Sequence, residues 1–250
     1  AATAGADALG RHVYAAGVAW ATRLRPDWFA AYSYDRWRPT LVLTAADDTD
    51  PWRGGVARDV EVNAGASIAF RTTRRTQSVF AAMHLSVDTF DCLTCAPVID
   101  TQVRRHAVRG GWSFTSARRY GYSISREDGM AVAAAGEWAP GELGSTGDSQ
   151  AFVAEARAFL PAAPRHGVVA LRAAMAAASG DDTAAREFGA GGPGQSGGLA
   201  FGRDAVGLVR GFDTDDVVGR RALVLNADYR VPLAWVERGA GTWPVFLRAL

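Results

Sequence analysis

The sequence predicts an all-β fold, an antiparallel up-and-down transmembrane β-barrel of which the chain carries only a part. Three observations lead to this prediction. Apolar and polar residues alternate along most of the chain, short and long connections alternate between these segments, and tryptophans gather near the segment ends. Each observation is typical of a sheet that crosses a bilayer by its strands.

The alternation has a period of two residues. In residues 59–71, valines, alanines, Ile68 and Phe70 fall on one face, while Asp59, Glu61 and Asn63 fall on the other. Residues 78–88 and 223–231 show the same pattern. A strand separates residues in this way, whereas a helix with its period of 3.6 does not.

The alternation and the turn signals between segments predict about ten strands. Several exceed the roughly 5–6 residues of an ordinary strand and reach the ~10 residues that a tilted strand needs to cross a bilayer. Alanine favours helix in 131–135 and 168–178, but the glycine, tryptophan and β-branched neighbours favour strand. The expected strands are 11–24, 27–48, 56–74, 77–90, 103–127, 129–139, 149–160, 166–180, 219–234 and 242–250.

The connections between these strands alternate in length. The short ones are 25–26, 75–76, 127–128 and 161–165; the long ones are 49–55, 91–102, 141–148 and 181–218. This alternation puts all long loops at one end of the sheet, as in outer-membrane barrels with their long extracellular loops.

The tryptophans lie mostly near strand ends or loops, which suits the headgroup level of a bilayer. The alternative is that they are core aromatics of a soluble β-protein. They are Trp20, Trp28, Trp37, Trp52, Trp112, Trp138, Trp235 and Trp243.

Composition limits the possible functions. The 250 residues are 48% hydrophobic with a net charge of +1, which excludes a disordered chain and argues against a nucleic-acid partner. All 27 basic residues are arginine, so a P-loop lysine, a Schiff-base lysine and a Ser–Lys dyad are excluded. No run of about 18 apolar residues predicts a transmembrane helix. The chain starts at Ala1 without methionine and stops at Leu250 just after an apolar run, so we expect it to be part of a longer protein.

The last third of the chain carries two motifs. The loop 181–218 is rich in glycine and ends in the first motif, which is Val209, Arg210, Gly211 and Phe212. The following strand carries the second motif, which comprises Asn226, Asp228, Tyr229, Arg230 and Pro232. Together they resemble the BamA-type superfamily of outer-membrane assembly and translocation barrels, the bacterial surface antigen family.

This resemblance implies a sixteen-stranded barrel, of which residues 1–250 would supply about ten strands of one domain. It implies that 181–218 is an extracellular loop that folds into the lumen. Arg210 would then be the lumenal anchor, Gly211 would permit a tight turn, and Phe212 would pack beside it. The family's acidic partner strand should follow Leu250, and Asp228 or Glu155 are alternative partners of Arg210 because both face inward in the expected register.

The resemblance also implies a function. We expect a non-enzymatic protein of the bacterial outer membrane that inserts or translocates polypeptide or lipid, without a cofactor or metal. Its partners would be outer-membrane lipid, the substrate, and periplasmic or lipoprotein components. The alternatives are a passive channel or structural barrel, and a hydrolase that uses His84 and Asp88.

Other patterns carry less. Gly192, Gly194 and Gly197 match a dinucleotide fingerprint but lack its βαβ setting. His84, Ser86 and Asp88 are spaced about 7 Å apart along one strand, too far for direct hydrogen bonding, which favours a polar lumen wall. The acidic groups Asp47, Asp48, Asp50 and Asp213, Asp215, Asp216 lack EF-hand spacing. Cys92 and Cys95 lie too isolated for a zinc site and suggest a loop disulfide or free thiols.

Overall fold

The computed structural model describes residues 1–20, 25–52, 55–91, 100–121, 123–192, 201–202, 205–213, 216–232, 235–239 and 246–249. Strands dominate, and the described residues include one 3₁₀ turn, η1 (Gly141–Leu143). No helix in these ranges is long and apolar enough to cross a bilayer. The all-β prediction is therefore confirmed.

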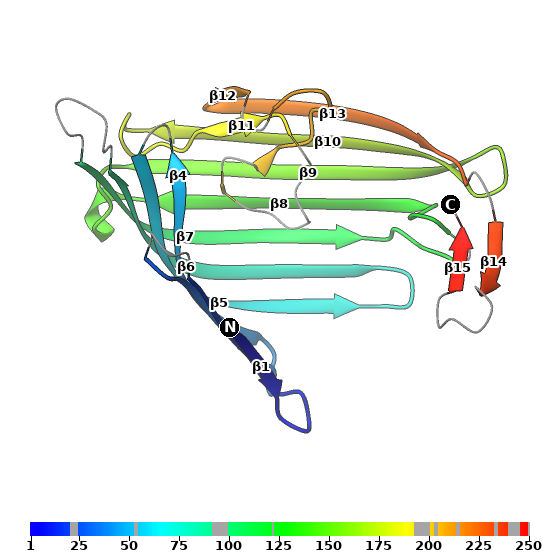
Figure 1. Cartoon of the computed structure of the whole chain (residues 1–250), viewed down its shortest axis with the longest axis horizontal. Coiled ribbons are helices and arrows are strands. Elements are labelled where there is room, and N and C mark those ends of the chain that lie inside the picture. The colour runs from blue at the N-terminus through cyan, green and yellow to red at the C-terminus, as the bar shows by residue number, and fades with distance from the viewer. Residues whose placement is uncertain are drawn as a thin grey trace.

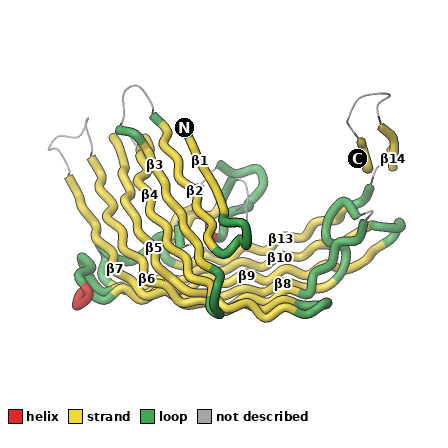
Figure 2. The backbone as a smooth tube through the Cα atoms, turned by 90° about the horizontal axis from the view of Figure 1, so that it is seen from below, coloured by secondary structure: helices red, strands yellow, loops and turns green. Residues whose placement is uncertain are grey.

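Eleven strands form one antiparallel sheet in which neighbours in sequence are neighbours in space up to β10. Figure 1 shows the long strands lying side by side, and Figure 2 shows the sheet bending into an open trough with β1 and β13 at its edges. The up-and-down topology is as predicted, and the described strands form an incomplete barrel that does not close. The strands are β1 (Ala2–Ala6), β2 (His12–Ala19), β3 (Asp27–Tyr34), β4 (Thr40–Trp52), β5 (Gly55–Arg71), β6 (Thr76–Asp91), β7 (Asp100–Thr115), β8 (Gly129–Ala139), β9 (Ser149–Ala162), β10 (Gly167–Gly180) and β13 (Arg221–Arg230).

The first part of the chain differs from the prediction. The single strand expected over 27–48 is two strands, β3 and β4, because the segment 35–39 turns. Asp35 begins this turn and accepts a hydrogen bond from the Thr40 hydroxyl at 2.7 Å, and Pro39 has no N–H for a sheet ladder. Residues 2–6, which had no predicted strand, form β1 and pair with β2.

The alternation of short and long connections is only partly correct. The loop expected over 49–55 is mostly strand, because β4 extends to Trp52 and β5 begins at Gly55. Conversely, β7 ends at Thr115 rather than at 127, which leaves a long connection at the end of the sheet where a short turn was expected. Within it, Arg118 pairs with Asp128 across an isolated bridge. The turns 72–75 and 163–166 are short, and the longest connection, 181–220, lies at the opposite end.

The end of the chain also departs from the prediction. The strand expected over 219–234 stops at Arg230, and β15 (Phe246–Ala249) lies within the segment expected as strand 242–250. Of the expected strand 242–250 the structure describes only 246–249, and this part pairs with β14 (Trp235–Gly239) in a separate two-stranded sheet. Figure 2 shows this hairpin standing apart from the trough.

The two faces of β6–β10 and β13 have opposite chemistry. On one, which we call the bare face, large apolar side chains are exposed. On the other, which we call the covered face, buried alanines, valines and ionic side chains lie under segment 181–220. The pleat sends alternate residues to opposite faces, so the register of each strand sets this separation. The exposed apolar residues of the bare face are Val79, Met83, Leu85, Val108, Trp112, Met130, Trp138, Phe152, Leu160, Leu171, Met175, Leu223, Leu225 and Tyr229.

Candidate functional site

The candidate site is segment 181–220 together with the covered face on which it packs. The segment leaves the sheet after β10, forms the short pair β11 (Phe188–Ala190) and β12 (Val217–Gly219), and returns as β13. The predicted loop 181–218 thus lies where expected between two neighbouring strands of the sheet, β10 and β13.

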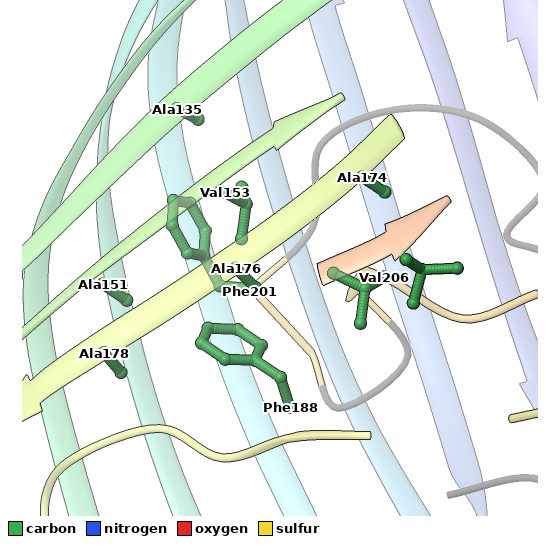
Figure 3. Packing of buried hydrophobic residues seen from close by; sticks show 10 residues of the cluster. Ala135, Ala151, Val153, Ala174, Ala176, Ala178, Phe188, Phe201 and Val206 are labelled. Atoms are coloured by element: carbon green, nitrogen blue, oxygen red, sulfur yellow. The ribbon is translucent and has the colours of Figure 1, made fainter. Parts of the chain in front are cut away.

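Apolar contacts hold the segment against the sheet. Phe188, Phe201 and Val206 are almost fully buried, and Figure 3 shows them beside the alanines of the neighbouring strands. The small wall residues let the segment approach closely, and each large side chain stabilises the contact by about 1.5–3 kcal/mol. The wall residues in this cluster are Ala135, Ala151, Val153, Ala174, Ala176, Ala178 and Val224.

A buried carboxylate lies beside this apolar cluster. The side chain of Glu137, on β8, is 1% exposed. Arg186 of the segment binds both of its oxygens, with Nε 2.5 Å from Oε1 and Nη2 2.9 Å from Oε2. Arg109 of β7 lies 2.7 Å from Oε2, and Arg105 lies 3.7 Å from Oε1. We call these four residues the Glu137 cluster.

Three guanidinium groups around one carboxylate leave an excess of positive charge, which is costly to bury. Further contacts of the guanidinium groups partly compensate this charge. The ring of Phe201 lies 5.0 Å from the Arg109 guanidinium and 5.9 Å from that of Arg186, which permits cation–π attraction. Arg186 also donates to the Phe201 carbonyl at 2.9 Å, and Arg105 donates to the Ser149 hydroxyl at 3.1 Å. The cluster therefore ties the first half of the segment to β7 and β8.

A second polar group holds the middle of the segment. Arg172 of β10 lies 3.0 Å from Glu155 of β9 and donates to the Val206 carbonyl at 3.0 Å. Asn226 of β13 donates to the Leu208 carbonyl at 2.9 Å and accepts from Arg172 at 3.3 Å. These bonds satisfy carbonyl groups that the irregular backbone would otherwise leave unpaired.

The loop motif forms a turn at the far side of this group. Gly211 has a φ of +83°, a conformation that glycine adopts without strain. Val209 pairs with Gly192 across an isolated bridge and packs against the apolar cluster. Phe212 is 54% exposed, so it is not buried in the apolar cluster, and its expected packing beside Arg210 stays a prediction.

Arg210 pairs with Asp228, with 3.0 Å between Nη1 and Oδ1. The side chain of Arg210 is 71% exposed and that of Asp228 is 15% exposed. Arg230 binds the other oxygen of Asp228, also at 3.0 Å. Of the two carboxylates considered from the sequence, Asp228 is thus the partner, while Glu155 binds Arg172.

The remaining residues of the strand motif have separate surroundings. Tyr229 lies on the bare face, and its hydroxyl donates to the Ala163 carbonyl in the β9–β10 turn. Pro232 follows the end of β13 and is half-buried. The motif therefore divides between the two faces, and only Asn226, Asp228 and Arg230 point toward the segment.

The other sequence candidates do not assemble into a reactive site. His84 is buried, and its Nδ1 lies 2.7 Å from the Asn63 side chain of β5. No hydrogen bond in the described chain joins it to Ser86 or Asp88. Among the described residues, no group of three His, Cys, Asp or Glu side chains has a metal-binding arrangement.

Several sequence candidates lie wholly or partly outside the described residues. Cys92, Cys95, Gly194, Gly197 and Asp215 are among them. Trp243 also lies outside the described residues. The acidic partner strand that the resemblance implies would follow Leu250 and is not part of this sequence.

Sequence reasoning did not find the Glu137 cluster. Arg186 carries no motif, and Glu137 is one acid in an alanine-rich strand. In the structure Arg109 stands opposite Glu137. The turn expected at 127–128 would have paired other residues of these two strands, so this register was not predicted.

Comparisons with known proteins do not assign this chain to a family. No protein-family model matches the chain, and no curated protein matches it. The resemblance of the two motifs thus rests on the residues themselves.

Proposed function

We propose that this chain is part of a bacterial outer-membrane β-barrel of the BamA type, which inserts or translocates polypeptide or lipid. The main support is the distribution of side chains over the sheet. Large apolar side chains are exposed on the bare face, and ionic groups are buried on the covered face. In water this arrangement exposes apolar surface at a cost, whereas in a bilayer it puts that surface against lipid.

The exposed tryptophans also support a location in a bilayer. Trp20, Trp28 and Trp138 are exposed and lie close to the sheet end from which segment 181–220 emerges. Indole rings favour the headgroup region of a bilayer. Exposed Trp37 lies in the β3–β4 turn at the opposite end, so rings occur at both expected headgroup levels. By the resemblance, the end that carries segment 181–220 would be the extracellular end, and the segment would enter the barrel lumen from there.

The anchored segment supports the transport function. Its first half is tied to β7 and β8, and its motif turn is tied to β13. A segment held on the inner wall by separate polar and apolar contacts can block the lumen and move when those contacts change. No nucleotide is needed, because substrate folding and burial would supply the free energy.

The bilayer is tested by two matched leucines. Leu225 is 70% exposed in the middle of β13 on the bare face, and Leu9 is 69% exposed in the β1–β2 turn. Arginine at a lipid-facing midplane position costs about 2–4 kcal/mol, but it costs little on a water-exposed surface. In the full-length protein, Leu225→Arg should lower the yield of heat-resistant barrel in the outer membrane, and Leu9→Arg should not.

Equal, normal yields of both variants would contradict the proposed location of the bare face in a bilayer and would support a soluble β-protein.

The transport function needs a separate measurement. Depletion of the full-length protein should reduce heat-resistant folding of other outer-membrane barrels, or export of a polypeptide or lipid. Normal export and assembly, with the protein still in the outer membrane, would support a passive channel instead.

A further inference from the structure

A shallow groove crosses the bare face of β8, β9, β10 and β13 near the end from which segment 181–220 emerges. Its volume is about 430 Å³. Gly136 and Ala177 form its floor, while Trp138 and Phe152 rise from it and Arg221 borders it. An added Cβ at Gly136 would come no closer than 3.9 Å to another atom, so this floor is open.

The strand register orders the groove into rows. Toward the loop end, Trp138 stands opposite Gln150, which stands opposite Ser179. Gln150 donates to the Ser179 hydroxyl at 3.0 Å. The next row toward the middle of the sheet contains Gly136, Phe152, Ala177 and Arg221.

Beyond these two rows the bare face becomes apolar. The row there contains Ala134, Ala154, Met175 and Leu223. Polarity therefore falls along the groove from the strand ends toward the middle of the sheet. This is the order of groups in a lipid, from headgroup to acyl chain.

Charge selects the kind of headgroup. In the part of the chain that the structure describes, Arg221 forms no ion pair, whereas its neighbour Arg220 binds Asp182 at 2.6 Å. A free guanidinium beside a hydroxyl and an amide suits a phosphate. A neighbouring hollow toward the loops is lined by Glu142 and Asp148, which would repel an anion. The anion should therefore lie on the Arg221 side of Phe152.

We propose that this groove binds a lipid with an anionic, phosphate-bearing headgroup. Its phosphate contacts Arg221, Ser179 and Gln150, and its acyl chains lie along Phe152, Ala177 and Met175. The inference rests on the proposed bilayer location, since only a bilayer presents lipid to this face. Trp138 lies in the headgroup row, as expected for an indole at that level.

Native mass spectrometry of the full-length protein in detergent tests the inference, with phosphatidylglycerol as the probe and phosphatidylcholine as the neutral comparison. Arg221→Gln should weaken phosphatidylglycerol binding about tenfold, since it removes a charge-assisted hydrogen bond. Gly136→Leu should also weaken it by filling the floor without a change of charge. Arg220→Gln is the matched control and should bind within about twofold of the original protein.

Two outcomes would overturn the site while leaving the bilayer proposal intact. One is equal binding by all variants from a protein that still reaches the outer membrane. The other is full competition by glycerol phosphate, which would indicate a soluble phosphate ligand. A protein that does not enter the outer membrane would overturn both proposals, and Leu225→Arg detects that failure separately.

Discussion

The two halves of segment 181–220 are anchored in different ways. The first half contributes Arg186 to a cluster around a carboxylate that is 1% exposed, whereas the second half contributes Arg210, which is 71% exposed. When a buried ion pair loses one partner, the other charge stays buried without compensation, which costs much stability. When an exposed pair loses one partner, water solvates the remaining charge, which costs little. The sequence motif therefore marks the weaker anchor, and the stronger one lies at residues without a motif.

The largest effect should come from Glu137→Gln. This change leaves Arg105, Arg109 and Arg186 buried without their shared carboxylate, and we expect a loss of about 3–5 kcal/mol of stability. The measurement is urea unfolding of the full-length protein in detergent, followed by tryptophan fluorescence.

Glu142→Gln is the control for this variant, because Glu142 is an exposed acid in the 3₁₀ turn after β8. It should change stability by less than about 0.5 kcal/mol. If Glu137→Gln is as mild as Glu142→Gln, the cluster does not hold the fold.

Arg186→Ala should have the next largest effect. It removes two hydrogen bonds to Glu137 and one to the Phe201 carbonyl, but Arg105 and Arg109 still neutralise Glu137. We expect a loss of about 2–3 kcal/mol, since hydrogen bonds to charged groups are the strong ones. Limited proteolysis should cut 181–202 faster than in the original protein while the sheet strands stay protected. Unchanged cleavage would show that apolar packing alone fixes this half.

Asn226→Ala should have a smaller effect at the boundary between the two anchors. It removes the hydrogen bond to the Leu208 carbonyl and one from Arg172, which together stabilise the fold by about 1–2 kcal/mol. Amide hydrogen exchange should speed up around 206–212 but not around 184–190. Equal acceleration in both stretches would mean that the two anchors are coupled.

The sequence predicts the sheet better than the site. Alternation located each of the six strands β5 to β10, although it made β7 too long, because a period of two is set by the backbone pleat and needs no tertiary information. It joined β3 to β4 because the turn signals of Asp35 and Pro39 were not recognised, and it missed β1, whose five residues are too short for a pattern.

The site depended on contacts between distant residues. The motif led to Arg210 and Asp228, which lie close together in sequence on either side of β12. Arg186 and Glu137 are 49 residues apart, and only the path of 181–220 over the covered face brings them together. An irregular segment has no period from which such a path could be predicted.

Arg210→Ala should have the smallest effect on stability. Arg210 is exposed, and Arg230 continues to neutralise the Asp228 carboxylate, so we expect a loss below about 1 kcal/mol. The yield of assembled barrel should fall more than this stability change explains, because the resemblance gives this arginine a role in loop placement during assembly. The measurement compares heat-resistant protein in the outer membrane with urea midpoints of the purified protein. Arg220→Ala, which removes another exposed arginine pair near the segment end, is the control and should lower neither quantity. Normal assembly of Arg210→Ala would leave Arg210 as an ordinary surface pair. The segment would then be held by the Glu137 cluster, the Arg172–Asn226 group and the apolar cluster.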